Sequence, residues 1–151
     1  MGTLVIRRAE LADLDAILDL YADDPLALHP PEKGGDRTKY EAALLAIQAD
    51  PRSAIHVATR EGVVVGTFQS TVLQHLTFEG ARVVQIEAVV VRSSERGRGV
   101  GTTMMQWALE DARAGGCTRA QLTSQKRREA AHRFYERLGF TPSHEGLKRS
   151  L

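Results

Sequence analysis

Three glycines at alternate positions, Gly97, Gly99 and Gly101, stand between an apolar run and an amphipathic run. Because glycine has no side chain, the backbone N–H groups of this turn can approach an anion closely, and the first N–H groups of a following helix have no partner within the helix. Arg96 and Arg98 add positive charge, and the helix dipole contributes about 0.3–1 kcal/mol per favourably placed charge. The segment therefore predicts a phosphate-binding loop, with a pyrophosphate as its expected ligand.

Two nucleotide-binding signatures do not fit this loop. The P-loop spacing G-x-x-x-x-G-K-[ST] is absent, and the third glycine of the dinucleotide fingerprint is replaced by Thr102. The segment does fit R/Q-x-x-G-x-G/A, and it resembles the loop with which the GNAT superfamily of N-acetyltransferases grips the pyrophosphate of acetyl-coenzyme A. The resemblance implies a cofactor-binding loop made of Arg96, Gly97, Arg98, Gly99, Val100, Gly101 and Thr102.

A second motif follows at the distance expected for that superfamily. The run AHRFYERLGF, residues 131–140, resembles its signature A-x-x-F-Y-x-x-x-G-F. The resemblance implies that Tyr135 is the general acid that protonates the coenzyme A thiolate, while Phe134 packs in the core. An aromatic side chain that merely lies on the core face of a helix is the alternative for Tyr135.

The chain departs from the superfamily at one position of this motif. Many members have an asparagine seven positions before the tyrosine, and this chain has Arg128 there. With Lys126 and Arg127, Arg128 is a candidate phosphate contact or part of a solvated charged turn, and we favour the solvated turn.

The apolar run Val83–Val91 precedes the glycine loop and predicts a strand covered by helices on both faces. Simple alternation places Val84, Ile86, Ala88 and Val90 on one face and Val83, Gln85, Glu87, Val89 and Val91 on the other. The resemblance implies that this strand splays from its neighbour at a bulge, and that the pantetheine arm binds along Ala88, Val89, Val90 and Val91. The N–H of Val89 would then donate to the thioester carbonyl, and such donors are worth roughly 2.7–4 kcal/mol in acyl transfer.

Glu87 is the candidate base. A carboxylate in an apolar strand is costly to bury, and desolvation would raise its pKa toward the working pH. A carboxylate paired with an arginine, or one that only binds the substrate ammonium, is the alternative. Gln85 lies on the same face, and His29 and His75 lie where the superfamily builds its acceptor pocket, so all four residues are candidate substrate contacts.

The composition excludes several classes of protein. The 151 residues carry a net charge of +1, which gives no support to binding of nucleic acid or of an anionic membrane. No run approaches the roughly 20 apolar residues of a membrane span, and the first residues lack a signal-peptide apolar region, so we expect a cytoplasmic protein. Cys117 is the only cysteine, and no metal site is predicted.

The remaining pattern predicts the elements around these motifs. A helix starts near Thr38, capped by its hydroxyl and by Glu41, and ends before Pro51. The other expected elements are a strand at Leu4–Arg7, a helix at 11–21, a loop at 23–35, a hairpin of Ala54–Thr59 and Val63–Leu73, a helix after the glycine loop, a strand at Ala120–Thr123, a helix at Arg128–Leu138 and a terminal strand at Leu147–Leu151.

These elements predict an α/β (α+β) chain in the order β-α-α-β-β-β-α-β-α-β, which is the order of the GNAT fold. We expect a mixed central sheet of about six or seven strands flanked by about four helices, in a single domain over residues 1–151. The resemblance implies direct transfer of an acetyl group from acetyl-CoA to a primary amine of a small molecule in a ternary complex, and a homodimer as the possible assembly. A peptide N-terminus or lysine as acceptor, or a noncatalytic acyl-CoA sensor, are the alternatives.

Overall fold

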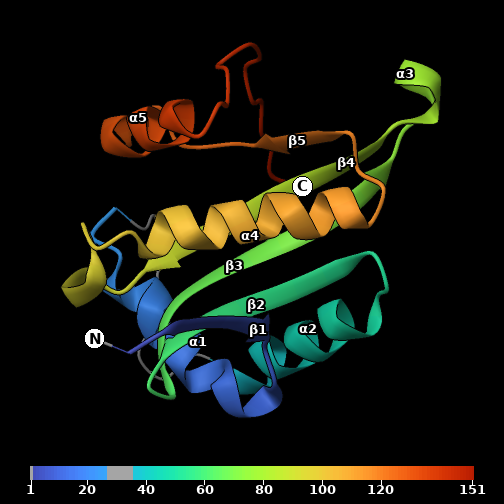
Figure 1. Ribbon diagram of the computed structural model, residues 1–151. Helices are drawn as coiled ribbons and strands as arrows, with labels where there is room; N and C mark the ends of the chain where they lie inside the picture. The colour runs from blue at the N-terminus through green and yellow to red at the C-terminus, as the bar shows by residue number, and fades with distance from the viewer. Residues whose placement is uncertain (1, 27–35) are drawn as a thin grey trace.

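The computed structural model describes residues 2–26 and 36–151, and its elements follow the predicted order up to the last helix (Figure 1). The single-turn 3₁₀ segments are Leu11–Asp13 and Ser93–Glu95. The strands and helices are β1 (Leu4–Arg8), α1 (Leu14–Asp23), α2 (Arg37–Ala49), β2 (Ser53–Arg60), β3 (Val63–Gln74), α3 (Thr77–Gly80), β4 (Arg82–Val91), α4 (Val100–Ala114), β5 (Arg119–Leu122) and α5 (Glu129–Arg137).

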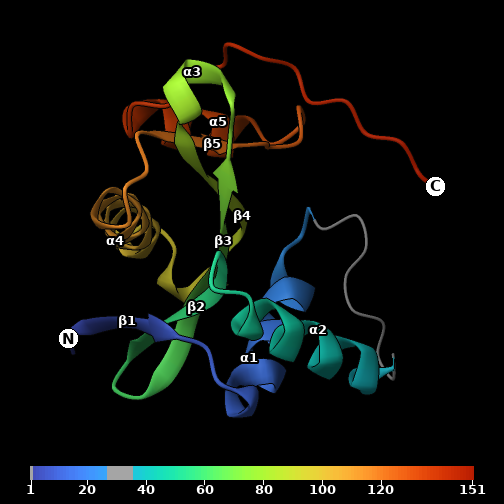
Figure 2. The same ribbon diagram turned by 90° about the vertical axis from the view of Figure 1, so that its right-hand side faces the viewer.

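The strands form one mixed sheet in the order β1-β2-β3-β4-β5. The first four strands pair antiparallel, whereas β5 lies parallel to β4, because α4 carries the chain back across the sheet between them. Helices α1 and α2 cover one face, and α4 covers the other (Figure 2). This arrangement confirms the predicted fold class.

The number of strands is smaller than predicted. The sheet has five strands, and the expected terminal strand at Leu147–Leu151 has no regular secondary structure. Leu147 is 91% exposed, so no burial of its side chain stabilises a strand at this end of the chain. Four longer helices flank the sheet as expected, and α3 is only a short turn at the tip of the β3–β4 hairpin.

The two faces of β4 differ from simple alternation. Val84 and Ile86 are buried under α4, as predicted for one face, but beyond Ala88 it is Val89 that packs with them while Val90 packs with the cluster under α1 and α2. The cause is a β-bulge, in which Ala88 has φ 49° and the pairing with β3 shifts between Thr67 and Gln69. One extra residue reverses the face of every later side chain.

The N-terminus of α2 also differs from the expected capping box. The helix begins at Arg37, and Asp36 is its N-cap, because the Asp36 carboxylate accepts a hydrogen bond from the Thr38 N–H at 3.1 Å. Thr38 lies inside the first turn and donates its hydroxyl to Asp36 instead of capping the helix itself. Within the described residues, none of the helices is long and apolar enough to cross a membrane.

A bidentate ion pair joins β1 to the start of the helical layer. The Arg7 guanidinium donates to both oxygens of Asp13, at 2.7 and 2.9 Å, and the Glu10 N–H donates to the same carboxylate at 2.7 Å. The Asp13 side chain is only 9% exposed. The Arg7 hydrogen bonds lower the pKa of the Asp13 carboxyl below its ordinary value of 3.8.

We expect Asp13→Asn to destabilise the fold by about 1–3 kcal/mol at neutral pH, the usual effect of weakening hydrogen bonds to a buried charged group. The lowered pKa means that this contribution is complete above the unfolded-state pKa and is lost as pH falls through the folded-state pKa. Urea unfolding of both proteins across the acidic range should show their difference shrinking. Asp19→Asn, an exposed change on α1, is the control, and a difference independent of pH would contradict the assignment.

Candidate active site

The central feature of the candidate site is the separation of β4 from β5. The two strands pair only from Val83 to Ile86 on β4, opposite Arg119 to Leu122 on β5. Residues 87–91 continue past the last pair and carry the bulge at Ala88. The predicted bulge is therefore confirmed, and the backbone of 87–91 has no partner on its β5 side, as the predicted pantetheine contacts of Ala88, Val89, Val90 and Val91 require.

The glycine loop follows directly at the end of β4. Gly97 and Gly99 have φ values of 73° and 80°, which L residues rarely adopt, and a Cβ built on either would meet no protein atom within 4 Å. Gly99 is the N-cap of α4, and the first turn of α4 contains no acidic residue. The loop residues are thus exposed at the start of a helix whose first N–H groups have no partner within the helix, which is the geometry of an anion site.

Gly101 serves a different purpose from the other two glycines. It lies in the first turn of α4, and a Cβ there would be 3.2 Å from Cζ of Phe134 and 3.7 Å from a methyl carbon of Val91. Its missing side chain lets α5 approach the start of α4. The structure therefore adds a packing role for Gly101, and its predicted backbone contact with the ligand stays a prediction.

The end of α5 holds Tyr135 in place. The Gly139 N–H donates to the Glu136 carbonyl at 2.9 Å, and the Phe140 N–H donates to the Tyr135 carbonyl at 3.1 Å. With Gly139 at φ 94°, these two bonds form a Schellman motif, which places Phe140 against the residue five positions earlier. The Tyr135 and Phe140 rings are accordingly 6.0 Å apart, edge to face.

Tyr135 is half-buried, and its ring packs against the same hydrophobic cluster as Val89 and Val91. Burial raises the pKa of its phenol, and the positive charge of Arg128 partly opposes that effect. The phenol is therefore protonated at neutral pH. Within the described part of the chain its hydroxyl makes no hydrogen bond, so it can donate to a ligand.

Glu87 lies on the open side of the splay, but it is exposed. The expectation of a buried carboxylate is wrong, because β5 ends before it could cover this position. Its Oε1 accepts from Gln85 Nε2 at 3.1 Å, and Gln85 in turn accepts from Gln121 Nε2 at 2.9 Å. The structure thus brings Gln85 and Glu87 together and adds Gln121 of β5, which the sequence pattern did not single out.

Of the two predicted histidine contacts, only His75 lies within the described residues, and it is far from this place. His29 lies outside the described residues. His75 follows β3 at the tip of the hairpin, where α3 stands at the opposite end of the molecule from the glycine loop (Figure 1). Gln69 pairs with Glu87, and six residues of strand from there to His75 span roughly 20 Å.

The end of α1 connects the parts of the site, which the sequence analysis missed. Asp23 accepts a hydrogen bond from the Ser93 N–H at 3.1 Å, and Asp24 forms an ion pair with Arg128 at 2.9 Å. The Arg128 side chain is 24% exposed, so the favoured solvated turn is wrong for Arg128. No single-sequence signal marks these pairs, because the partners lie about 70 and 100 positions apart.

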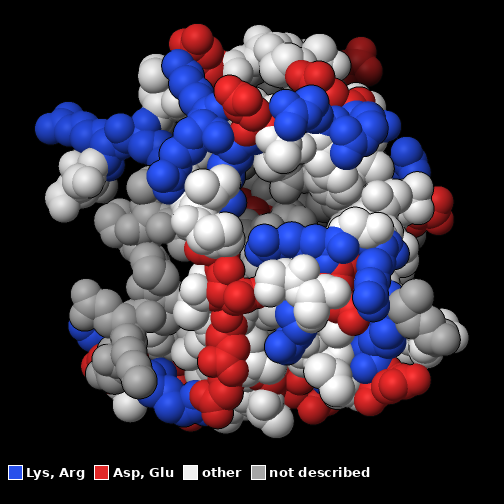
Figure 3. All heavy atoms as spheres, turned by 90° about the vertical axis from the view of Figure 1, so that its left-hand side faces the viewer, with Lys and Arg blue, Asp and Glu red and all other residues white. Residues whose placement is uncertain are grey.

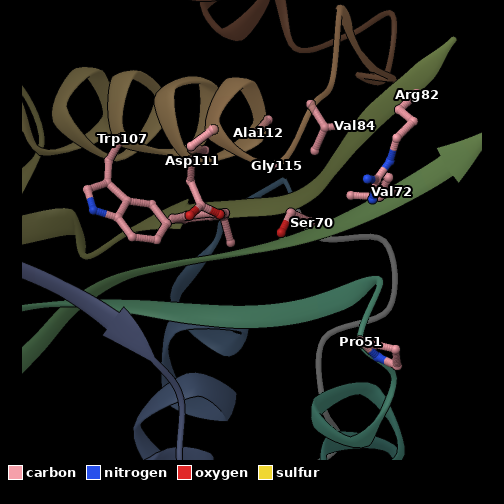
Figure 4. Close-up of a pocket in the computed structure, with 12 residues that line it drawn as sticks. Pro51, Ser70, Val72, Arg82, Val84, Trp107, Asp111, Ala112 and Gly115 are labelled. Atoms are coloured by element: carbon pink, nitrogen blue, oxygen red, sulfur yellow. The ribbon is translucent and has the colours of Figure 1, made fainter.

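A cavity of about 260 Å³ lies elsewhere, between β3 and the C-terminal half of α4 (Figure 4). Trp107 and Asp111 of α4 face Ser70 of β3 across it, and Arg82 stands at its far side. Its lining includes Ala114 and Gly115 at the C-terminal end of α4, whereas the glycine loop lies at the N-terminal end of that helix. The cavity is therefore separate from the candidate site.

The face that carries the start of α4 is rich in positive charge. Figure 3 shows Lys and Arg side chains gathered around a hollow on this face, with acidic side chains forming a stripe below it. Because opposite charges attract over several ångströms in a partly enclosed site, this face favours an anionic ligand.

Comparisons with known proteins agree with this geometry. The model of the Acetyltransferase (GNAT) family matches residues 14–140. The aminoalkylphosphonate N-acetyltransferase of Salmonella typhimurium is 30% identical over 151 residues, with 100% of this chain and 94% of that protein covered. The glucosamine 6-phosphate N-acetyltransferase of Trypanosoma brucei brucei is 32% identical over 154 residues, with 98% and 96% covered.

A solved structure agrees over its full length. A protein described as a transcriptional regulator from Bacillus halodurans C-125 has a TM-score of 0.92 and 38% sequence identity, with 99% of this chain and 100% of that chain covered. The similarity therefore includes the glycine loop, the splayed strand and α5.

We expect Gly101→Ala to destabilise the fold only while Phe134 is present. Crowding a packed contact costs about 1–3 kcal/mol, whereas alanine is favoured over glycine within a helix by about 1 kcal/mol. In a Phe134→Leu background the same change should become neutral or stabilising, which thermal unfolding of the four proteins would measure. Phe78→Leu, at an exposed ring on the hairpin tip, is the control background. Equal effects in all backgrounds would contradict the packing role.

Proposed function

The chain belongs to the GNAT family of acetyltransferases, which take their acetyl group from acetyl-CoA, and we propose that it transfers this group to the primary amine of a small molecule. The observation that carries the proposal is the convergence of three parts at one end of the sheet. The glycine loop, the splayed segment 87–91 and Tyr135 are joined through Phe134 and the cluster that Val89 and Val91 share with Tyr135.

The residues divide the reaction among them. The backbone of the glycine loop and the first turn of α4 bind the pyrophosphate, and the backbone of residues 88–91 holds the pantetheine arm. The Val89 N–H donates to the thioester carbonyl oxygen and stabilises the negative charge that forms there as the amine attacks. Positioning of both substrates in one complex makes the attack effectively intramolecular.

Two side chains move the protons. Glu87, exposed beside the splay, accepts a proton from the ammonium through water and so frees the amine lone pair. The amine nitrogen then forms a bond to the carbonyl carbon and releases its second proton to water, and the carbon–sulfur bond breaks. Tyr135 donates its proton to the departing thiolate and regains one from the solvent. The Gln121–Gln85–Glu87 hydrogen bonds hold the carboxylate on the acceptor side.

The names of the relatives favour a small, anionic acceptor. Aminoalkylphosphonate and glucosamine 6-phosphate are both primary amines that carry a phosphonate or phosphate group. A small amine of this class is our first choice, and a peptide N-terminus or lysine is the second. A regulatory role is the candidate from another class, since the Bacillus halodurans protein is described as a transcriptional regulator. A noncatalytic acyl-CoA sensor would be one form of that role.

The experiment that tests this function is a thiol-release assay with acetyl-CoA across aminoalkylphosphonates, amino sugar phosphates, uncharged amines and peptides. Calorimetry of acetyl-CoA binding runs beside it. Release with one acceptor class establishes the enzyme and its substrate class. Tight acetyl-CoA binding without release from any acceptor would favour the sensor.

We expect Tyr135→Phe to lower turnover by about 10²-fold, the usual scale for loss of an acid–base group. Its affinity for acetyl-CoA should be unchanged, because the ring still packs against Phe140 and the hydroxyl makes no contact that holds α5. Steady-state kinetics and calorimetry measure the two effects. Tyr40→Phe on α2 is the matched control. Turnover equal to that of the unchanged protein would rule out the acid role.

Glu87→Gln separates a base from a substrate contact. For a base, turnover should fall by about 10²-fold with a nearly unchanged KM. A carboxylate that only binds the ammonium would instead raise KM and leave turnover intact. Glu79→Gln at the hairpin tip is the control. If neither parameter moved, the carboxylate would have no part in the reaction.

A further inference from the structure

Two arginines at the start of α5 converge on one carbonyl. Arg127 and Arg128 both donate from Nη2 to the carbonyl oxygen of Leu26, the latter at 3.0 Å. Their guanidinium groups therefore lie next to each other, although like charges repel. Asp24, paired with Arg128 at 2.9 Å, neutralises one of these charges.

A third arginine lies close to the same place. Arg96 of the glycine loop donates from Nε to the Val91 carbonyl at 3.3 Å. It follows the turn whose Ser93 N–H donates to Asp23 at 3.1 Å, so it stands near the end of α1. Its positive charge accordingly helps to lower the pKa values of both Asp23 and Asp24. Three arginines thus lie near the end of α1, where Asp23 and Asp24 supply two carboxylates.

The hydrogen bonds of these arginines orient their guanidinium groups without cancelling the positive charge. Among the described residues, neither Arg96 nor Arg127 forms an ion pair, and Arg127 donates to the Leu26 carbonyl and to the Gln125 side-chain oxygen. Those two bonds use two of the five N–H donors of a guanidinium, so three remain. The ion pair with Asp24 explains Arg128 as a structural residue, but it does not explain the exposed Arg127 beside it.

We propose that Arg127 and Arg128, with Arg96 beside them, form an anion-binding site that is distinct from the glycine loop and takes a phosphate or phosphonate group. Guanidinium groups suit such an anion, because their planar donors bind two oxygens at once. Arg128 is positioned by Asp24, and Arg127 supplies the free donors. The inference rests on the proposed function for the choice of ligands.

Two ligands of the reaction can supply this anion. One is the 3′-phosphate of coenzyme A, whose pyrophosphate would bind at the neighbouring glycine loop. The other is an anionic group on the acceptor amine. Both have the same chemistry, a tetrahedral group with charged oxygens, and binding measurements separate them.

The test is calorimetry with four ligands: coenzyme A, coenzyme A lacking the 3′-phosphate, and, in the presence of coenzyme A, an aminoalkylphosphonate and the alkylamine of equal length. The ligands form two pairs, coenzyme A with and without its 3′-phosphate, and the amine with and without its phosphonate. In one pair, we expect Arg127→Gln to weaken binding of the member that carries the phosphate or phosphonate by about 10-fold, the effect of losing a charged hydrogen bond of roughly 1.4 kcal/mol. The other member of that pair should bind as before. A loss for coenzyme A assigns the 3′-phosphate, and a loss for the phosphonate assigns the acceptor.

Arg127→Lys keeps the charge but removes the paired donors, so it should give a smaller loss than Arg127→Gln. Arg133→Gln, an exposed change on α5, is the matched control, and thermal unfolding checks that all variants are folded. Equal losses for both members of a pair, or no loss for any ligand, would overturn the site. These binding measurements need no turnover. Failure of the thiol-release assay would therefore count against the proposed function and not against the anion site.

Discussion

The separation of β4 from β5 after Ile86 is the constraint on which the rest of the site depends. A paired strand would use its backbone groups within the sheet, and no ligand could reach them. Here β5 ends at Leu122, and the bulge at Ala88 turns the remaining segment. Backbone groups without a partner on β5 thus remain beside the glycine loop, and the Glu87 side chain stays exposed.

The loss of sheet pairing has to be compensated, and the contact between α4 and α5 does so. Phe134 fills the space above Gly101, and its ring lies 5.2 Å from that of Tyr135. The Schellman motif at Gly139 adds the contact of Tyr135 with Phe140. Helix α5 therefore replaces β5 as the neighbour of the splayed segment, and the same packing that covers the core brings the phenol to the site.

Much of this could be predicted from the sequence, because local signals determined it. The glycine loop, the hairpin and the Gly139 cap each follow from residues close together in the chain. The resemblance predicted a bulge in β4, but simple alternation still gave the wrong faces after Ala88, because it gives no sign that Ala88 adopts a positive φ. The exposure of Glu87 likewise depends on where β5 ends, which is a property of two strands and not of one.

Charge pairs between distant segments were the least predictable feature, and they give the end of α1 its importance. Asp23 holds the turn that leads to the glycine loop, and Asp24 holds the start of α5. Adjacent residues of one helix thus connect the proposed cofactor loop with the helix that carries Tyr135. Because both contacts depend on the last turn of α1, a shift of that turn would move the turn before the glycine loop and the start of α5 together.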